Sequence, residues 1–253
     1  METREIMLGL AIKNNGEWNS IYSDLVNKNT DFDVENVLNG FTGDFITLLD
    51  QEYPETLNQI YKPPFVLFYK GNINLLKNTS KNCLVSGTRT PTREGEQFAQ
   101  ELFSENLKNR NLVVSLTKGI NEIIINNCTN VIAVIACGFD QLDDYSKMLM
   151  DKVLANNGLV ITEYPNNVPP DQQTHMSKVR IMVGLSTKTI LLESNKHGSQ
   201  PAIVSMTLFN GHDLFVAPTS PANKNSINNQ LIKKGAFPIL DRETLEYDLD
   251  EKH

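Results

Sequence analysis

Long apolar runs are absent from this chain of 253 residues, and so are the sequence features of secretion, disulfide bonding and metal binding. No segment approaches the length of about 20 apolar residues that a membrane-spanning helix needs. The N-terminus, METREIMLGL, carries acidic residues where a signal peptide would be basic. Cys83, Cys128 and Cys137 are scattered, and no Cys/His spacing matches a metal site. We therefore expect a cytoplasmic protein with buried, reduced thiols, no metal and no membrane partner.

Motifs of common nucleotide-dependent and hydrolytic enzymes are also missing. A dinucleotide site needs G-x-G-x-x-G, but only Gly87 and Gly95 stand near the corresponding turn. Neither G-x-x-x-x-G-K-[ST], which binds nucleotide phosphates, nor the nucleophile motif G-x-S-x-G occurs. The four histidines have no obvious nucleophile beside them. These absences argue against an enzyme and against a bound cofactor.

The net charge of −7 is unevenly distributed along the chain. Residues 1–60 carry 11 acidic and 3 basic side chains, and residues 238–253 carry 6 acidic and 2 basic ones. The segment between them, 61–237, carries 18 basic against 13 acidic side chains. A mildly basic centre between acidic ends is compatible with a local site for a polyanion, although an ordinary solvated surface would show the same balance.

Residues 61–240 alternate between short apolar segments and longer amphipathic segments. Several of the strand-like segments are continuously apolar and β-branched, and the set comprises 82–86, 111–115, 131–136, 158–162, 188–193, 213–217 and 236–240. The helix-length segments between them are 93–108, 119–128, 143–156, 175–185, 199–210 and 224–234. Buried strands joined by helices are typical of parallel sheets with right-handed crossovers. We predict an α/β fold with a Rossmann-like, doubly wound, mostly parallel sheet.

Two segments flank this predicted Rossmann-like domain. Residues 1–60 are polar and rich in asparagine, with short candidate helices at 21–26 and 34–38, and we predict a small N-terminal helical module and linker there. Residues 241–253 are predicted to form an acidic C-terminal tail. The expected organisation is therefore a small module, one large domain over 61–240, and a tail.

The strand-to-helix corner NCLVSGTRTPTREG is the most informative stretch of the chain. An apolar strand breaks at Gly87-Thr88-Arg89, and a helix follows with Thr92 as its expected N-cap. Such a corner directs backbone N–H groups and a helix N-terminus to one place, which suits a phosphate group. Lys118 follows the next strand, and because parallel strands end at one edge of a sheet we expect it to lie beside Arg89. The anion should belong to a nucleotide or to a nucleic-acid backbone.

The edge of the sheet where Arg89 and Lys118 are expected is hereafter called the rim. Two carboxylates, Glu163 and Asp140, are expected near it, and each has a structural as well as a functional interpretation. Each rim cation could form an internal ion pair with Glu163 or Asp140 instead of binding an external anion. The two carboxylates could also act as a pair in glycosidic-bond chemistry, but a helix cap at Asp140 and a loop contact at Glu163 are favoured. Lys178 and Arg180 lie two positions apart and share no helix face, yet both could reach the rim from a helix entry.

An ordered series of motifs in this chain resembles the DprA/Smf DNA-processing family of bacteria. In chain order the matching segments are Asp50–Tyr53-Pro54, Pro63-Pro64, Phe68-Tyr69-Lys70-Gly71-Asn72, Gly87-Thr88-Arg89, Lys118-Gly119-Ile120, Cys137-Gly138-Phe139-Asp140, Thr162-Glu163-Tyr164-Pro165, Arg180-Ile181, Gly198-Ser199, Ala217-Pro218 and Gly235-Ala236. Each motif alone is weak, whereas the ordered series is specific.

The resemblance implies a non-enzymatic protein that binds single-stranded DNA, forms dimers, protects incoming DNA and loads the RecA recombinase during natural transformation. The residues that it implies for DNA binding are Arg89, Lys118, Lys178, Arg180, Gly198 and Ser199. We expect the loop residues Gly87, Thr88 and Gly119 to take part in the same site. Tyr164 is a candidate for stacking on a base. The chain departs from the family pattern at Ala136, which replaces a glycine, and no winged-helix segment follows, so we expect a divergent, reduced member.

Two other functions remain open from the residues alone. A nucleotide-binding or nucleotide-hydrolysing protein, similar to the lysine-decarboxylase-like enzymes, would use the same architecture, but its P-G-G-x-G-T-x-x-E signature is absent. A degenerate scaffold that keeps its partner contacts without a ligand would also fit the acidic ends. The motif series favours single-stranded DNA over both.

Overall fold

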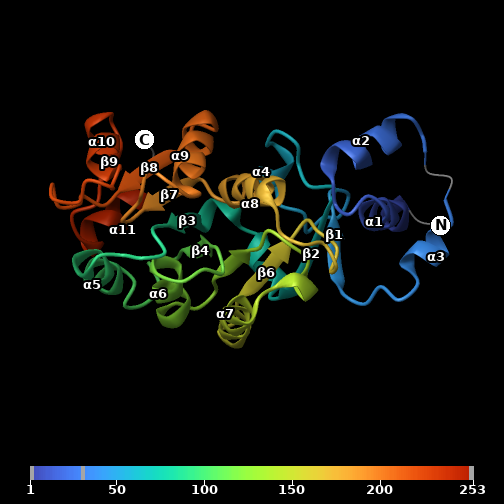
Figure 1. Ribbon diagram of the computed structural model, residues 1–253, viewed down its shortest axis with the longest axis horizontal. Coiled ribbons are helices and arrows are strands. Elements are labelled where there is room, and N and C mark those ends of the chain that lie inside the picture. The colour runs from blue at the N-terminus through green and yellow to red at the C-terminus, as the bar shows by residue number, and fades with distance from the viewer. Residues whose placement is uncertain (1–2, 30–31, 251–253) are drawn as a thin grey trace.

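The protein is built around one nine-stranded sheet. The computed structural model describes residues 3–29 and 32–250. Its strands are β1 (Asp44–Thr47), β2 (Val66–Gly71), β3 (Asn82–Ser86), β4 (Asn111–Val114), β5 (Ile132–Val134), β6 (Leu159–Thr162), β7 (Lys188–Leu191), β8 (Asp213–Val216) and β9 (Phe237–Pro238). They lie side by side in the order β1-β2-β6-β5-β4-β3-β7-β8-β9 (Figure 1). The strands β3 to β9 are parallel, which confirms the predicted mostly parallel α/β sheet.

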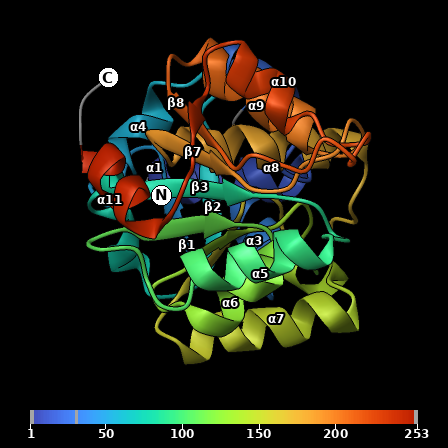
Figure 2. The same ribbon diagram turned by 90° about the vertical axis from the view of Figure 1, so that its left-hand side faces the viewer.

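Helices cover both faces of this sheet. They are α1 (Thr3–Lys13), α2 (Trp18–Val26), α3 (Val34–Leu38), α4 (Glu55–Asn58), α5 (Arg93–Leu102), α6 (Ile120–Asn127), α7 (Asp144–Ala155), α8 (Gln172–Gly184), α9 (Gln200–Phe209), α10 (Asn228–Lys233) and α11 (Arg242–Asp250). The helices α5, α6 and α7 lie on one face, and α8, α9 and α10 lie on the other (Figures 1 and 2). Side chains of the central strands are therefore buried on both sides, as their continuous apolar runs predict.

Helix α5 is shorter than its amphipathic pattern predicts. The pattern continues to residue 108, and both Phe103 and Leu107 are indeed buried, but the helix ends at Leu102. Arg242 donates to the carbonyl oxygens of Leu102 at 3.2 Å and Asn106 at 2.6 Å. A distant side chain thus satisfies one carbonyl that the end of the helix leaves free and one in the loop that follows, which local periodicity cannot reveal.

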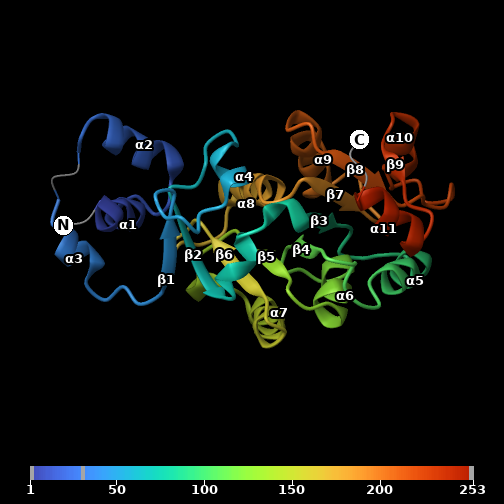
Figure 3. The ribbon, with the colours of Figure 1, turned by 180° about the vertical axis from the view of Figure 1, so that it is seen from behind.

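The N-terminal part of the chain is joined to the large sheet. Helices α1, α2 and α3 form a small module at one end of the molecule (Figures 1 and 3). β1 pairs antiparallel with β2, and β2 pairs antiparallel with β6, so the sheet begins at Asp44, before the predicted boundary at residue 60. The turn after α1 packs against the end of β6, where a Cβ on Gly16 would lie 2.6 Å from the Glu163 carbonyl oxygen. This turn of the module therefore packs at the carboxyl end of β6.

The segment predicted as an acidic tail is a packed helix over most of its length. Leu245 and Leu249 of α11 are buried in the main core. The carboxylate of Asp250 forms an ion pair with Arg110, and Arg242 pairs with Glu246 at 3.1 Å. The segment was predicted to be a tail because it is acidic. Its two buried leucines nevertheless stand four positions apart, as in a helix with one buried face. Residues 251–253 lie outside the described part of the chain.

The sequence predicts no membrane-spanning helix and three buried, reduced thiols. Within the described ranges, no helix is both long and apolar enough to cross a membrane. Cys83, Cys128 and Cys137 are free and buried, and burial raises the pKa of the Cys83 thiol to about 11. A buried thiol with a raised pKa behaves as a small apolar side chain.

Asn228 joins the loops at the carboxyl ends of β7 and β8. Its side chain is fully buried, and its amide donates to the carbonyl oxygens of Leu192 and Ala217. Its side-chain oxygen accepts from the backbone N–H of Ser194 at 3.2 Å and from the hydroxyl of the same residue. One amide thus satisfies four polar groups that have no access to water.

We predict that Asn228→Ala lowers the free energy of unfolding by about 3 kcal/mol, because it leaves several buried donors and acceptors without partners. Urea denaturation followed by circular dichroism measures the change. Gln230→Ala, at an exposed position of the same helix, is the matched control and should alter stability by less than about 0.5 kcal/mol. Equal effects of the two substitutions would contradict the role assigned to Asn228.

Candidate functional site

The sheet has a topological switch point between β3 and β7. From β3 the chain adds β4, β5 and β6 on one side, and it later adds β7, β8 and β9 on the other. The helix after β3, α5, and the helix after β7, α9, lie on opposite faces (Figure 2). Open α/β sheets bind ligands at such a point, outside the carboxyl ends of the strands. Arg89 follows β3 at this position, and Asn195 follows β7.

The Gly87–Thr88 turn after β3 is held by internal hydrogen bonds. The N–H of Thr88 donates to the carbonyl oxygen of Glu193 at 2.6 Å, and its hydroxyl accepts from the amide of Asn195 at 3.0 Å. The carbonyl oxygen of Gly87 accepts from Gln200 at 2.8 Å. Gly87 and Thr88, which were predicted to bind the ligand, therefore use these groups to stabilise the turn. A Cβ on Gly87 would lie 2.6 Å from the Ile120 side chain. The predicted free N–H groups of this turn are partly used inside the protein.

A second turn, after β4, lies directly against the first. Gly119 has a φ of +78°, and a Cβ there would lie 2.5 Å from the carbonyl oxygen of Thr88 and 2.8 Å from the Cα of Arg89. The N–H of Ile120 donates to the same Thr88 oxygen at 3.2 Å. Glycine is needed here because two backbones meet and because other residues rarely adopt this φ. The contact places Lys118 beside Arg89, as expected from the parallel strands.

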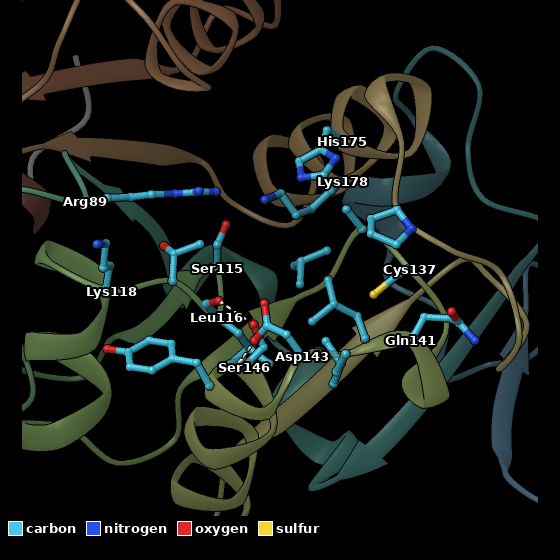
Figure 4. Close-up of a pocket in the computed structure, with 17 residues that line it drawn as sticks. Arg89, Ser115, Leu116, Lys118, Cys137, Gln141, Asp143, Ser146, His175 and Lys178 are labelled. Atoms are coloured by element: carbon cyan, nitrogen blue, oxygen red, sulfur yellow. Dashed lines mark hydrogen bonds between the residues drawn. The ribbon is translucent and has the colours of Figure 1, made fainter.

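A cavity of about 280 Å³ opens between these turns and the first turn of α7. Its floor is apolar, with Leu116, Val134, Ile135, Ala136 and Leu142, and its polar lining includes Arg89, Ser115, Thr117, Lys118, Gln141, Asp143, Ser146, His175 and Lys178. In Figure 4 the Lys178 amine lies near the Arg89 guanidinium, and the Lys118 side chain stands beside the other end of the Arg89 side chain. The cavity that these three residues line is hereafter the rim cavity. The predicted meeting of cations from neighbouring strands is therefore observed.

Lys178 reaches the rim cavity from α8 and is only 6% exposed. None of the ion pairs recorded for the described residues involves its ammonium group. Burial, reinforced by the positive charge of Arg89, lowers the pKa of Lys178 to about 8. An incoming anion would replace the lost hydration of this group and relieve its repulsion by Arg89.

A second cavity of about 540 Å³ adjoins the first and shares Arg89, His175 and Lys178 with it. Gly198 and Ser199 line this cavity, which agrees with their predicted place at the rim. Gly198 has a φ of +101°, so the turn before α9 depends on glycine. The shared cations lie between two hollows, an arrangement that suits a chain with a phosphate between two nucleosides.

Arg180 does not reach either cavity, contrary to its predicted place among the rim cations. Its Nη2 atom donates to both carboxylate oxygens of Glu163 at 2.6 Å, and the two side chains are 13% and 5% exposed. The internal ion pair that was considered for the other cations is thus formed by Arg180. Lys178 and Arg180 lie on different faces of α8, as their spacing of two requires.

The aromatic residue at the rim also differs from the expectation. Tyr164 is 5% exposed and packs beneath the Gly16 turn, so it cannot stack on an external base. Tyr145 lines the rim cavity and is 40% exposed. Asp143, not Asp140, is the N-cap of α7 and accepts from the N–H of Ser146 at 2.7 Å. The sequence analysis did not single out Tyr145 or Asp143. Both stand at the start of a helix that follows a central strand. Residues at that position lie at the ligand-binding edge of a parallel sheet, so the sequence could have identified them.

A third cavity, of about 740 Å³, lies beyond the Thr88–Thr92 turn and has the opposite charge balance. Glu94 and Glu193 line it, with Lys224 as the one cation among its described lining residues. Glu193 accepts from the N–H of Thr92 at 2.8 Å and from Asn223 at 2.8 Å, so it fixes the start of α5. This larger hollow is unsuited to a polyanion, which leaves the rim cavity as the candidate anion site.

Comparison with known proteins relates this chain to DNA-processing proteins. A family model described as DNA recombination-mediator protein A matches residues 44–250. DNA processing protein DprA of Bacillus subtilis is 29% identical over 216 residues, which cover 82% of this chain and 72% of the relative. DprA of Streptococcus pneumoniae is 30% identical over 196 residues, covering 75% and 68%. Protein Smf of a Synechocystis species is 28% identical over 222 residues, covering 78% and 56%.

Solved structures show the same architecture. The X-ray structure of DprA from Streptococcus pneumoniae superposes with a TM-score of 0.78 at 25% identity, covering 93% of this chain and 83% of the other. DNA processing protein A from Helicobacter pylori superposes with a TM-score of 0.69 at 22% identity, covering 82% and 96%. Since the family model spans well over half of its length, this chain belongs to the DNA recombination-mediator protein A family, to which the DprA and Smf proteins are related.

Proposed function

We propose that this chain binds single-stranded DNA at the rim cavity and acts as a recombination mediator. The observation that carries the proposal is that Arg89, Lys118 and Lys178 line one cavity, with Lys178 buried and outside the recorded ion pairs. Cations that lack internal partners supply the phosphate contacts that dominate affinity for nucleic acids. Two adjoining cavities that share two of these cations fit an unpaired strand better than an isolated nucleotide.

The comparisons support a single strand as the ligand. The Helicobacter pylori relative was described for its unique single-stranded DNA binding mode, and its fold matches that of this chain. Acidic side chains of the flanking segments are partly engaged in ion pairs with neighbouring cations, such as Asp50 with Arg4 and Asp24 with Lys13. The charge that a strand meets at the rim is set by the side chains near it, so the negative net charge of the chain does not by itself oppose binding there.

A RecA-type recombinase partner, protection of incoming DNA and a homodimer belong to the same proposal. Leu208 and Phe209 at the end of α9 are 59% and 83% exposed, far from the rim, and are available for contact with a second copy. We further propose that the protein acts by binding and not by catalysis. Ser115 and His175 in the rim cavity pair with Met182 and with the carbonyl oxygen of Asp171, not with each other. A thermal-shift screen with mononucleotides tests the alternative of a nucleotide-dependent enzyme.

We predict that Arg89→Ala and Lys118→Ala each weaken the binding of a labelled poly-dT strand and lower the salt slope of log affinity by about one unit. Fluorescence anisotropy across a salt series measures both quantities. Lys77→Ala is the matched control, because Lys77 is exposed and precedes β3 at the opposite edge of the sheet. Unchanged affinity in both rim variants would reject the proposed site.

The buried amine of Lys178 should make binding sensitive to alkaline pH. Since its pKa is lowered to about 8, the group is mostly charged at pH 7 and mostly neutral at pH 9. The affinity for DNA should therefore fall as the pH rises through this range, because a neutral amine no longer attracts phosphate. Lys178→Arg, which stays charged, should flatten the profile. A wild-type profile that is already flat from pH 7 to 9 would contradict this role of Lys178.

Arg180 is expected to affect stability and not DNA contact. Arg180→Gln leaves the buried Glu163 carboxylate without its partner, which should lower the free energy of unfolding by about 3 kcal/mol. The salt slope of DNA binding by the folded variant should stay at the wild-type value. A slope lower by one unit, with stability unchanged, would instead place Arg180 at the DNA.

A further inference from the structure

Aromatic side chains gather on the surface of the N-terminal module, away from the rim cavity. Tyr22 of α2 is 51% exposed, and Tyr61, in the segment after α4, is 75% exposed. Trp18 links them, because its ring stacks on Tyr22 with centroids 5.0 Å apart and the Lys62 ammonium lies 5.2 Å from the Trp18 ring and 5.5 Å from the Tyr61 ring. These four side chains are hereafter the tyrosine patch. Exposed rings that lie together are typical of a binding surface.

The centre of the tyrosine patch is fixed by contacts inside the protein. The indole N–H of Trp18 donates to the carbonyl oxygen of Pro63 at 2.7 Å, and the indole ring also stacks on Phe65 with centroids 5.2 Å apart. Nζ of Lys62 donates to Oδ1 of Asn19 at 2.6 Å, which uses one of the three N–H groups of the ammonium. Since these groups are in place before a ligand binds, ordering them costs little on binding.

The tyrosine patch adjoins the start of α8, the helix that carries Lys178 to the rim cavity. The side-chain amide of Gln173 donates to Oε1 of Glu17 at 3.4 Å, and Glu17 is the N-cap of α2. Gln172 and Met176 of the same part of α8 line the second cavity. Both α2 and α8 lie in the upper half of Figures 1 and 3. A helix rises about 1.5 Å per residue, so the five steps from Gln173 to Lys178 span only about 8 Å.

The charges at this place are compatible with a phosphate backbone. The carboxylate of Glu17 accepts from the N–H groups of Asn19 at 3.0 Å and Ser20 at 2.7 Å, so the positive end of α2 offsets its charge. Lys62 adds an ammonium group beside two aromatic rings. Proteins that bind unpaired strands without regard to sequence combine these two features, since cations contact the phosphates and aromatic rings stack on the bases.

We propose that the tyrosine patch is a second contact region for a single strand bound at the rim. The strand runs from the rim cavity through the second cavity, crosses the start of α8 at Gln172 and Met176, and places further bases on Tyr61 and Tyr22. This inference rests on the proposed binding of single-stranded DNA and adds a path for the strand beyond the rim. The N-terminal module thereby takes part in binding long strands, whereas the rim alone binds short ones.

Two thymidine oligonucleotides of different length, dT4 and dT20, test this path by fluorescence anisotropy. Tyr22→Leu and Tyr61→Leu remove a ring but keep an apolar side chain, and each should weaken dT20 about fivefold and leave dT4 unchanged. Both positions are exposed, so the thermal midpoints should stay at the wild-type value. Tyr247→Leu is the matched control, because Tyr247 is 67% exposed on α11 at the other end of the sheet (Figure 1), and it should alter neither affinity.

Lys62→Gln tests the phosphate contact of the tyrosine patch. Loss of one cation should lower the salt slope for dT20 by about one unit and leave the slope for dT4 at the wild-type value. Arg89→Ala should weaken dT4 and dT20 alike, since both strands use the rim. Wild-type affinity for dT20 in both tyrosine variants, or an equal loss for dT4 and dT20 in them, would overturn the proposed path.

Trp18 reports on the tyrosine patch directly, because it is the single tryptophan of the chain. Saturation with dT20 should quench its emission, whereas saturation with dT4 should leave the emission unchanged. Unquenched emission with dT20 fully bound would overturn the inference, leave the patch for a protein partner and leave the proposed function intact. Failure of the wild-type chain to bind either strand would reject the proposed function itself.

Discussion

The candidate site depends on a contact between two backbone turns. Gly119, with its positive φ, lies against Thr88 and Arg89 so closely that any Cβ would displace one of the turns. The Thr88 turn is held in place from the other side by the backbone of Glu193 and by Asn195. Two cations from consecutive strands are thereby fixed beside each other, although their charges repel. The repulsion is tolerated because the turns are tied to the sheet and not to the cations.

Lys178 makes a second unfavourable contribution to the free energy of folding at the same place. A lysine that is almost fully buried and stands next to an arginine loses hydration, and none of the ion pairs recorded for the described residues gives it a carboxylate; its lowered pKa reflects the loss of hydration and the nearby positive charge. Such groups reduce the stability of the free protein, and their interaction with an anion becomes correspondingly more favourable. Arg180, two residues further along α8, has the opposite environment, because Glu163 neutralises it within the protein. Two neighbouring cations of one helix thus have opposite environments, because only Arg180 forms an ion pair with a carboxylate among the described residues.

The helical segments at the two ends of the chain support this arrangement from outside. The turn after α1 packs on Glu163 and Tyr164 at the end of β6, which is adjacent to the pair formed with Arg180. At the other end, Arg242 of α11 binds the carbonyl groups that follow α5. Both acidic ends therefore carry structure as well as charge, and the net charge of −7 says little about the charge at the rim.

The sequence by itself determined the alternation of strands and helices, the parallel sheet and the position of Arg89 and Lys118 after neighbouring strands. Periodicity and the end of each apolar run were enough for this, because they depend on residues close together in the chain. Only the tertiary structure decided that Arg180 turns to Glu163, that Tyr145 and not Tyr164 faces the cavity, and that residues 242–250 form a helix on the core. These outcomes depend on partners from distant segments, and a one-dimensional pattern contains no record of which segments meet.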